Sequence, residues 1–392
     1  MLRLSQPATD PAFVQDPYAF YARARAAAGD LFFWQEYGLP MAVSFEAVNT
    51  LLRDRRFGRE PVTPRPFPPH LAPFYAVEAH SMLELDGPRH ARLRGLALRA
   101  FTRRRIAGLA PEIEALAHAL IDAFPAGEFD LLPAFAQRIP IVIICRLLGV
   151  PEAMADQLLA WSHDMVAMYQ ARRDRALEDR AVAATEAFVT FMRAYVDERR
   201  ATPRDDLISE LIAAEEAGEK LTTDELITTC ILLLNAGHEA TVHAMANAIK
   251  LLLETGSQAA LRAPETREAA VEETLRLDPP VHLFTRHAHE DVELFGHRFA
   301  RGDEVGLLLG AANRDPAIWR EPDRFDPTRP PLTNVSFGAG AHFCIGAPLA
   351  RLELGTALPV LFARCPNLAL ARPPEYANLY HFHGLTALSV TC

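Results

Sequence analysis

The feature that most constrains the fold is a helical pattern of about 34 residues, from Thr222 to Thr255, with no proline to break it. Thr222 and Glu225 have the spacing of a capping box at its start, and such a helix would span about 50 Å. Polar residues and a glycine interrupt the apolar run at its middle: Asn235, Gly237, His238, Glu239 and Thr241. Because a glycine inside a helix costs about 1 kcal/mol, we expect either a core helix with a few satisfied polar groups or one whose middle approaches a ligand.

The rest of the chain indicates a mainly α protein of the α+β class. Residues 91–260 have helical periodicity, with breaks expected at Pro140, Pro151 and residues 202–204. Two short strands are expected around the turn at residues 295–297, a second turn at residues 301–302, and a last strand in GLTALSVTC at the end. Half of the 392 residues are apolar, and no repeat or linker divides them, so we predict one domain over residues 1–392.

Charge and cysteine usage exclude several classes of protein. A net charge of −10 argues against nucleic-acid binding, which needs a basic surface. The five cysteines are scattered and form no CxxC pair, which argues against a disulfide framework and a structural zinc site. The N-terminal residues show no signal-peptide pattern, and no apolar run approaches about 20 residues. We therefore predict a cytoplasmic protein without a membrane anchor.

The segment VSFGAGAHFCIGAPLARLE carries the strongest chemical signal. Gly338, Gly340 and Gly346 surround Cys344 and permit tight turns with positive φ. A helical pattern follows, with Pro348 in its first turn. Cys344 should thus lie just before a helix N-terminus, whose N–H groups and dipole stabilise a thiolate, a suitable axial ligand for haem iron. A buried structural cysteine or a cysteine hydrolase is the alternative, but a histidine only two residues away cannot easily reach the geometry of a base.

The string FGAGAHFCIG resembles the haem-binding signature of the cytochrome P450 family, as found in soluble bacterial members, and the resemblance extends from DPYAFYARARA to the last strand. It implies that fold: a large helical body with small β-sheets, and haem b between a long distal helix and the proximal cysteine loop. By this resemblance Cys344 is the axial ligand of the iron and His342 contacts a haem propionate. Phe337 packs near the sulfur, and Gly346 belongs to the haem-binding loop.

Other segments supply further residues of the expected haem site. Glu273 and Arg276, at i and i+3, can pair on one helix face, and the resemblance makes them a buried structural pair. His90 and Arg94, four residues apart, share a face that suits a carboxylate. The resemblance implies that these two residues and Arg286 bind the haem propionates. Without the resemblance, His90 and Arg94 would fit an exposed basic face equally well.

The middle of the long helix departs from the family pattern. The resemblance implies that Ala236 and Gly237 lie over the haem and that Glu239 relays protons. Most members have a hydroxyl residue directly after that acid, whereas this chain has Ala240 followed by Thr241. Because one helical step rotates a side chain by about 100°, Thr241 cannot take over that place unless the helix bulges. We expect a water, the acid, Thr241 or a substrate hydroxyl to share the proton delivery.

The implied function is a monooxygenase that inserts one oxygen atom from O2 into a small or medium hydrophobic substrate by hydroxylation, O-dealkylation or epoxidation. A haem-thiolate peroxygenase using H2O2 is the alternative, and a non-catalytic haem- or ligand-binding protein is the remote one. The substrate pocket is expected at four residues: Val281, Leu283, Phe284 and Phe382. Apolar residues of the loop before Asp86 are expected to line it as well: Phe67, Leu71, Phe74 and Leu83.

Electrons are expected from a separate ferredoxin or flavodoxin-type donor and its reductase, with the protein as a monomer. A ferredoxin would need a basic docking face despite the acidic total. Several arginines could form that face: Arg92, Arg99, Arg103, Arg104, Arg105 and Arg351. A generic solvated arginine surface is an equally good interpretation of them.

Overall fold

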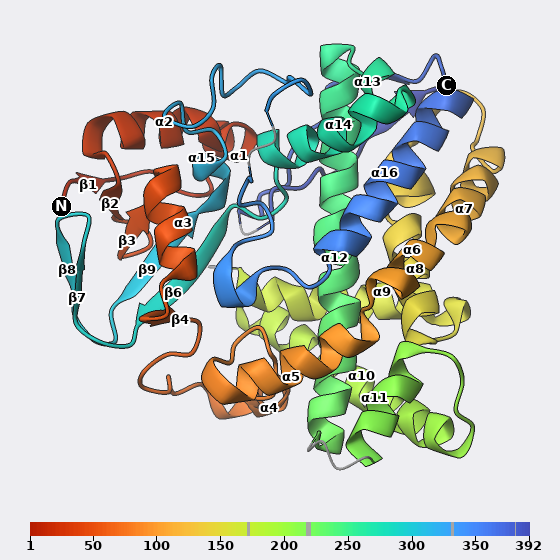
Figure 1. Cartoon of the computed structure of the whole chain (residues 1–392), viewed down its shortest axis with the longest axis horizontal. Coiled ribbons are helices and arrows are strands. Elements are labelled where there is room, and N and C mark those ends of the chain that lie inside the picture. Colours follow the sequence, from red (N-terminus) through yellow and green to blue (C-terminus); the bar gives the residue numbers. More distant parts are fainter. Residues whose placement is uncertain (171–172, 217–220, 331–332, 381) are drawn as a thin grey trace.

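The computed structural model describes residues 1–170, 173–216, 221–330, 333–380 and 382–392. Helix α12 (Thr223–Thr255) runs through the helical part of the molecule, and other helices cross it on several sides (Figure 1). The predicted capping box at its start is present between Thr222 and Glu225. Gly256, with φ of 65°, ends the helix in the left-handed conformation that glycine adopts most readily. The prediction of one long helix is confirmed.

The remaining helices follow the sequence periodicity closely. Their bounds before α12 are α1 (Pro11–Gln15), α2 (Pro17–Ala28), α3 (Phe45–Arg53), α4 (Ala72–Glu78), α5 (Gly87–Ala100), α6 (Arg103–Gly108), α7 (Ala110–Asp122), α8 (Arg138–Leu148), α9 (Ala155–Val166), α10 (Arg175–Ala201) and α11 (Leu207–Glu216). After α12 come α13 (Ala259–Arg262), α14 (Pro264–Leu277), α15 (Leu309–Ala312) and α16 (Ala347–Arg364). Within the described ranges, no helix is both long and apolar enough to cross a membrane.

The break expected at Pro140 lies elsewhere. Pro140 is inside the first turn of α8, where its missing N–H would have no helical partner anyway. The irregularity comes before it, as a short π-helix at Leu132–Ala136. The expected breaks near Pro151 and Thr202 are present, because α8 ends at Leu148 and α10 at Ala201.

Three small sheets accompany the helices. The largest has six strands in the order β1 (Arg3–Leu4), β2 (Leu31–Trp34), β3 (Leu39–Ala42), β9 (Glu304–Leu308), β6 (Leu283–Ala288) and β4 (Phe57–Gly58). A hairpin joins β7 (Val292–Leu294) to β8 (His297–Phe299), and β11 (Ser389–Thr391) pairs with β10 (Ala369–Leu370) and β5 (Glu128–Asp130). The predicted strands around residues 295–297 and at the chain end are confirmed, as is the mainly α class.

The cysteine loop joins the two parts of the fold. Val335 and Ala339, before the cysteine, are buried with α3 and the large sheet, whereas α16, after it, packs against α7, α12 and α14. Gly340 lies so close to α3 that a Cβ on it would overlap the carbonyl oxygen of Leu52, and its φ is 69°. The loop is therefore fixed from the sheet side and continues directly into the helical body.

Candidate functional site

Cys344 lies in a tight loop directly before α16. Its backbone N–H donates to the carbonyl of Phe337 at 3.0 Å, and Gly338 donates to Val335 at 2.9 Å. Gly338 and Gly340 have positive φ, as expected from the sequence, whereas Gly346 has φ of −81° and a right-handed conformation. These turns leave the Cys344 side chain accessible, whereas Cys145, Cys230 and Cys365 are buried.

The environment of the Cys344 sulfur has two opposing effects. Dense protein around the group raises the pKa of its thiol, although the atom itself can be reached by solvent. The backbone N–H groups of Gly346 and Ala347 lower the pKa, and so do the charges of Arg94 and Arg351. The N-terminus of α16 therefore lowers the pKa of the Cys344 thiol as expected, but burial raises this pKa by more.

A cluster of His90, His342 and Asp86 lies beside this loop. The rings of His90 and His342 pack with centroids 4.2 Å apart, and His342 Nε2 contacts Asp86 Oδ1 at 2.8 Å. Burial alone would raise the pKa of Asp86, but the bond from His342 and backbone N–H groups lower it to about 2. Burial and the nearby positive charge lower the pKa of His90 to about 4, so its imidazole is neutral. The Nε2 of His90 is buried and has no hydrogen-bond partner in the part of the chain that the structure describes.

Two guanidinium groups come to the same region from different elements. Arg94, one turn after His90 on α5, donates to the carbonyl of Phe343, next to the cysteine. Arg286, on β6, is 3% exposed and donates to the carbonyl of Thr285 at 2.9 Å. Burial lowers its pKa to about 10, so it is still charged at neutral pH. Among the described residues, neither guanidinium has a carboxylate within ion-pair distance.

Glu273 and Arg276 form a buried pair on α14. The carboxylate receives two bonds from Arg276, at 2.7 and 2.8 Å, and a third from Arg329 at 2.9 Å. Arg276 also donates to the carbonyls of Asn313 and Pro322, which belong to the segment before the cysteine loop. The pair therefore ties α14 to that segment.

The middle of α12 has one accessible face. Ala236 is exposed and Ala240 half-buried, whereas His238, Glu239 and Thr241 are buried. Positions 236 and 240 lie on one helical face. A side chain at Gly237 would instead meet Ile144 of α8 at 3.0 Å, so the packing of these two helices explains the glycine. The accessible face is thus lined by small alanine side chains.

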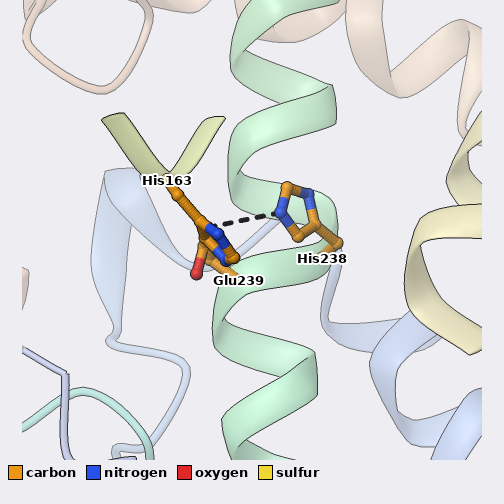
Figure 2. A group of neighbouring side chains, drawn as sticks. All are labelled: His163, His238 and Glu239. Atoms are coloured by element: carbon orange, nitrogen blue, oxygen red, sulfur yellow. Dashed lines mark ion pairs between the residues drawn. The ribbon is translucent and has the colours of Figure 1, made fainter. Parts of the chain in front are cut away.

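Glu239 points away from this face toward α9 (Figure 2). Its Oε1 lies 3.1 Å from His163 Nε2 and 3.3 Å from His238 Nε2. Burial would raise the pKa of Glu239, but the neighbouring histidines lower it. Thr241 donates to the carbonyl of Gly237 at 3.3 Å in a helix that stays regular. The bulge that would bring its hydroxyl to position 240 is not observed.

The residues expected around the substrate lie in different environments. Val281 and Phe382 are half-buried and connected by a β-bridge, and Phe284 is half-buried near the guanidinium of Arg59. Leu283 is buried with the N-terminal aromatic cluster. Of the remaining four, Leu71 and Phe74 are buried in the main core, Leu83 is half-buried and Phe67 is exposed.

Sequence reasoning missed three residues of these clusters. Asp86 precedes α5 at the cap position, but its carboxylate bonds His342 and the N–H of Glu60 instead of the helix. His163 and Arg329 each contact a predicted site residue through the tertiary fold alone. Only Asp86 had a local signal, namely an unused capping side chain before a helix.

The arrangement fits a large group that carries a metal ion and two carboxylates. The accessible thiol of Cys344 suits a soft metal ligand. Unpaired guanidinium groups on Arg94 and Arg286, and the unpartnered Nε2 of His90, suit two carboxylates. The alanine face of α12 suits a flat apolar surface. Haem has these features, so the residues present fit the cofactor expected from the sequence.

The comparisons with known proteins agree with this geometry. The family model described as "Cytochrome P450" matches residues 16–263 and 265–367. A mycinamicin IV hydroxylase/epoxidase from Micromonospora griseorubida is 38% identical over 85% of this chain and 83% of its own length. Cytochrome P450 monooxygenase PikC from Streptomyces venezuelae is 38% identical over 96% of this chain and 91% of its own.

Among solved structures, P450BioI in complex with hexadec-9Z-enoic acid ligated acyl carrier protein superposes with a TM-score of 0.91. The two chains are 34% identical, and the match covers 97% of this chain and 99% of that one.

Proposed function

The chain belongs to the cytochrome P450 family and is a haem-thiolate monooxygenase, and on this premise we propose that Cys344 binds the iron of haem b. The single observation that carries the assignment is the accessible Cys344 sulfur beside the N–H groups of Gly346 and Ala347. With Cys344 as its ligand, haem would supply the chemistry for O2 activation and for the transfer of one oxygen atom to the substrate. We also propose that residues 1–392 form one haem domain.

The protein holds the cofactor by charge and shape. Arg94 and Arg286, which have no carboxylate partner among the described residues, bind the two propionates, and His90 Nε2 adds a hydrogen bond. The His342 ring packs on His90 while Asp86 holds its Nε2. His342 therefore positions His90 and shields the propionates. Ala236 and Ala240 leave room over the opposite face of the cofactor.

Proton delivery in this chain centres on Glu239. Its carboxylate is buried on α12 one residue from the accessible face, and it contacts the half-exposed His163, which connects it to solvent. The Thr241 hydroxyl is engaged with the carbonyl of Gly237. We propose that Glu239 passes protons to a water or a substrate hydroxyl beside Ala240, the position at which the family pattern implies a hydroxyl residue.

A specific observation favours a second activity, the peroxygenase reaction. Ala240 gives the accessible face no hydroxyl, and the regular helix keeps that of Thr241 away from it. Peroxide supplies both oxygen atoms together with the two electrons and two protons that O2 would need, so the reaction requires no electron donor and no proton from solvent. Substitution Ala240→Thr should raise the fraction of reducing equivalents that reach product and leave peroxide-driven turnover unchanged. A coupling fraction that stays the same would exclude position 240 from proton delivery.

We propose a hydrophobic substrate of small or medium size near Val281, Phe284 and Phe382. The half-buried apolar side chains of these residues support this class. One relative is named for mycinamicin IV, and the solved structure holds hexadec-9Z-enoic acid on an acyl carrier protein, so mycinamicin IV and fatty acyl chains belong in the first screen. Binding is measured as a shift of the haem iron from low to high spin.

We further propose a separate ferredoxin or flavodoxin-type donor with its reductase, and a monomeric enzyme. Three of the arginines considered for docking are held in ion pairs: Arg92 with Glu225, Arg105 with Asp205, and Arg351 with Glu272. Arg103 and Arg104 are exposed, and no ion pair is recorded for them among the described residues. They are therefore the first choice for the docking face. The cytoplasmic location stays a prediction.

The iron ligand is tested by the spectrum of the reduced protein with carbon monoxide. The wild-type enzyme should show the red-shifted Soret band of a thiolate ligand. Cys344→Ser should lose this band, whereas the exposed Cys392 offers a matched control, since Cys392→Ser should keep it. A thiolate-type band in the Cys344→Ser protein would refute the assignment.

A further inference from the structure

Three side chains from two helices come close together at the middle of α12 (Figure 2). His163 comes from the last turn of α9, and His238 and Glu239 come from the middle of α12. One donor atom from each residue lies within 4.8 Å of the other two. Each of these atoms is of a type that binds transition metals.

The Nε2 atom of His238 faces the Glu239 carboxylate. His238 Nδ1 lies 2.7 Å from the carbonyl oxygen of Leu234 and donates to it, so Nε2 is the ring atom that is available to a ligand. That Nε2 lies 3.3 Å from the Glu239 carboxylate oxygen. Both atoms are buried, and neither has a hydrogen bond in the described residues. An imidazole nitrogen and a carboxylate oxygen buried at this distance are bridged by a positive charge, either a proton on the imidazole or a bound cation.

Two of the three distances match those between ligands of one metal ion, and the two imidazole nitrogens lie within 4.8 Å of each other. In a tetrahedral zinc site with bonds of about 2.0–2.1 Å, neighbouring ligand atoms are about 3.3 Å apart. The Glu239 oxygen lies 3.3 Å from one imidazole nitrogen and 3.1 Å from the other. The bond from His238 Nδ1 to a backbone carbonyl is the outer contact that usually orients a metal-bound histidine.

The site can also be reached from solvent. The His163 side chain is 50% exposed, whereas those of His238 and Glu239 are 1% and 7% exposed. An ion would thus enter on the His163 side and keep a water as its fourth ligand. The cluster of Asp278, His282 and His383 differs, because it is buried and both ring nitrogens of His282 lie near tyrosine hydroxyls.

We propose that His163, His238 and Glu239 form a Zn²⁺ site that inhibits the enzyme. Two imidazoles and one carboxylate suit Zn²⁺ better than Mg²⁺ or Ca²⁺, which prefer oxygen ligands. The bound ion occupies the Glu239 carboxylate, which can then no longer accept and pass on protons. The binding site stands on its contacts alone, whereas the inhibition rests on the relay role proposed for Glu239.

The binding is tested on the haem-loaded enzyme by calorimetric titration with ZnCl2 and by diffraction at the zinc absorption edge. One ion per chain is expected, with an anomalous peak between the three side chains. His163→Gln should weaken binding about tenfold or more. His297, on the β7–β8 hairpin, is the matched control, and His297→Gln should bind as the wild type does. No saturable binding, or equal binding by the His163→Gln protein, would overturn the site.

The inhibition is tested in the same preparations by measuring the fraction of reducing equivalents that reaches product. Zinc at saturating concentration should lower the coupled fraction about tenfold, in line with the loss of one acid–base group, and a chelator should restore it. In the His163→Gln enzyme, the same zinc concentration should leave the coupled fraction at the value that this variant has without zinc. Unchanged coupling in a zinc-loaded wild type would overturn the inhibition. Normal coupling by Glu239→Gln would show that the proposed relay itself fails, a result that the binding measurement does not depend on.

Discussion

The buried pair on α14 gives the sharpest prediction about stability. Glu273 is 5% and Arg276 1% exposed, and the carboxylate accepts four bonds, from Arg276 twice, from Arg329 and from the N–H of Asp326. Substitution Glu273→Gln keeps the shape of the side chain. It removes the charge that balances two guanidinium groups, and it places an amide NH2 where one oxygen accepted a bond.

The size of the effect follows from the burial. When one partner of a buried ion pair is removed, the charge left behind costs about 3–5 kcal/mol. Glu273→Gln retains the oxygen that accepts three of the four bonds, so we expect about 3 kcal/mol of lost stability. Since Arg276 also holds the segment before the cysteine loop, haem content should fall as well.

The neighbouring residue provides the control. Glu272 pairs with Arg351, but their side chains are 34% and 35% exposed, and exposed pairs contribute at most about 1 kcal/mol. Equilibrium urea unfolding of the wild-type, Glu273→Gln and Glu272→Gln holoenzymes, followed by circular dichroism, measures both effects. If the two variants lose equal stability, the argument from burial is refuted.

Three further predictions concern the loop, its electrostatics and the electron donor. Gly340→Ala should destabilise the protein and lower haem content, because the new Cβ overlaps a carbonyl of α3 at positive φ, whereas Gly355→Ala, where nothing lies within 4 Å, should be neutral or stabilising by up to about 1 kcal/mol. Asp86, whose pKa is lowered to about 2 in the folded protein, contributes stability above pH 4 that is lost as the pH falls toward 2. Urea unfolding should therefore show Asp86→Asn about 1–2 kcal/mol less stable than wild type at pH 6, with the gap shrinking below pH 4; a constant gap would contradict the sign. Arg103→Glu with Arg104→Glu should slow reduction by a ferredoxin and flatten its salt dependence, and stopped-flow rates equal to wild type at low salt would count against docking by charge.

The local pattern of the chain determined the helices and strands and the conformation of the loop that presents Cys344. The capping box and the terminal glycine define α12 without tertiary help, because both act within one turn. The glycines around Cys344 and the helix after it are likewise set by backbone conformation and by proline at a helix start. Such features depend on neighbours in sequence, which is why they could be predicted.

Only the tertiary structure determined which residues far apart in the sequence form hydrogen bonds and ion pairs. Asp86 binds His342 across 256 residues of chain, and His163 approaches Glu239 only because α9 packs on α12. The structure also showed that Gly237 serves helix packing against Ile144 and that Thr241 does not replace the hydroxyl missing at Ala240. Burial and distance set these interactions, and both depend on how helices far apart in sequence pack together.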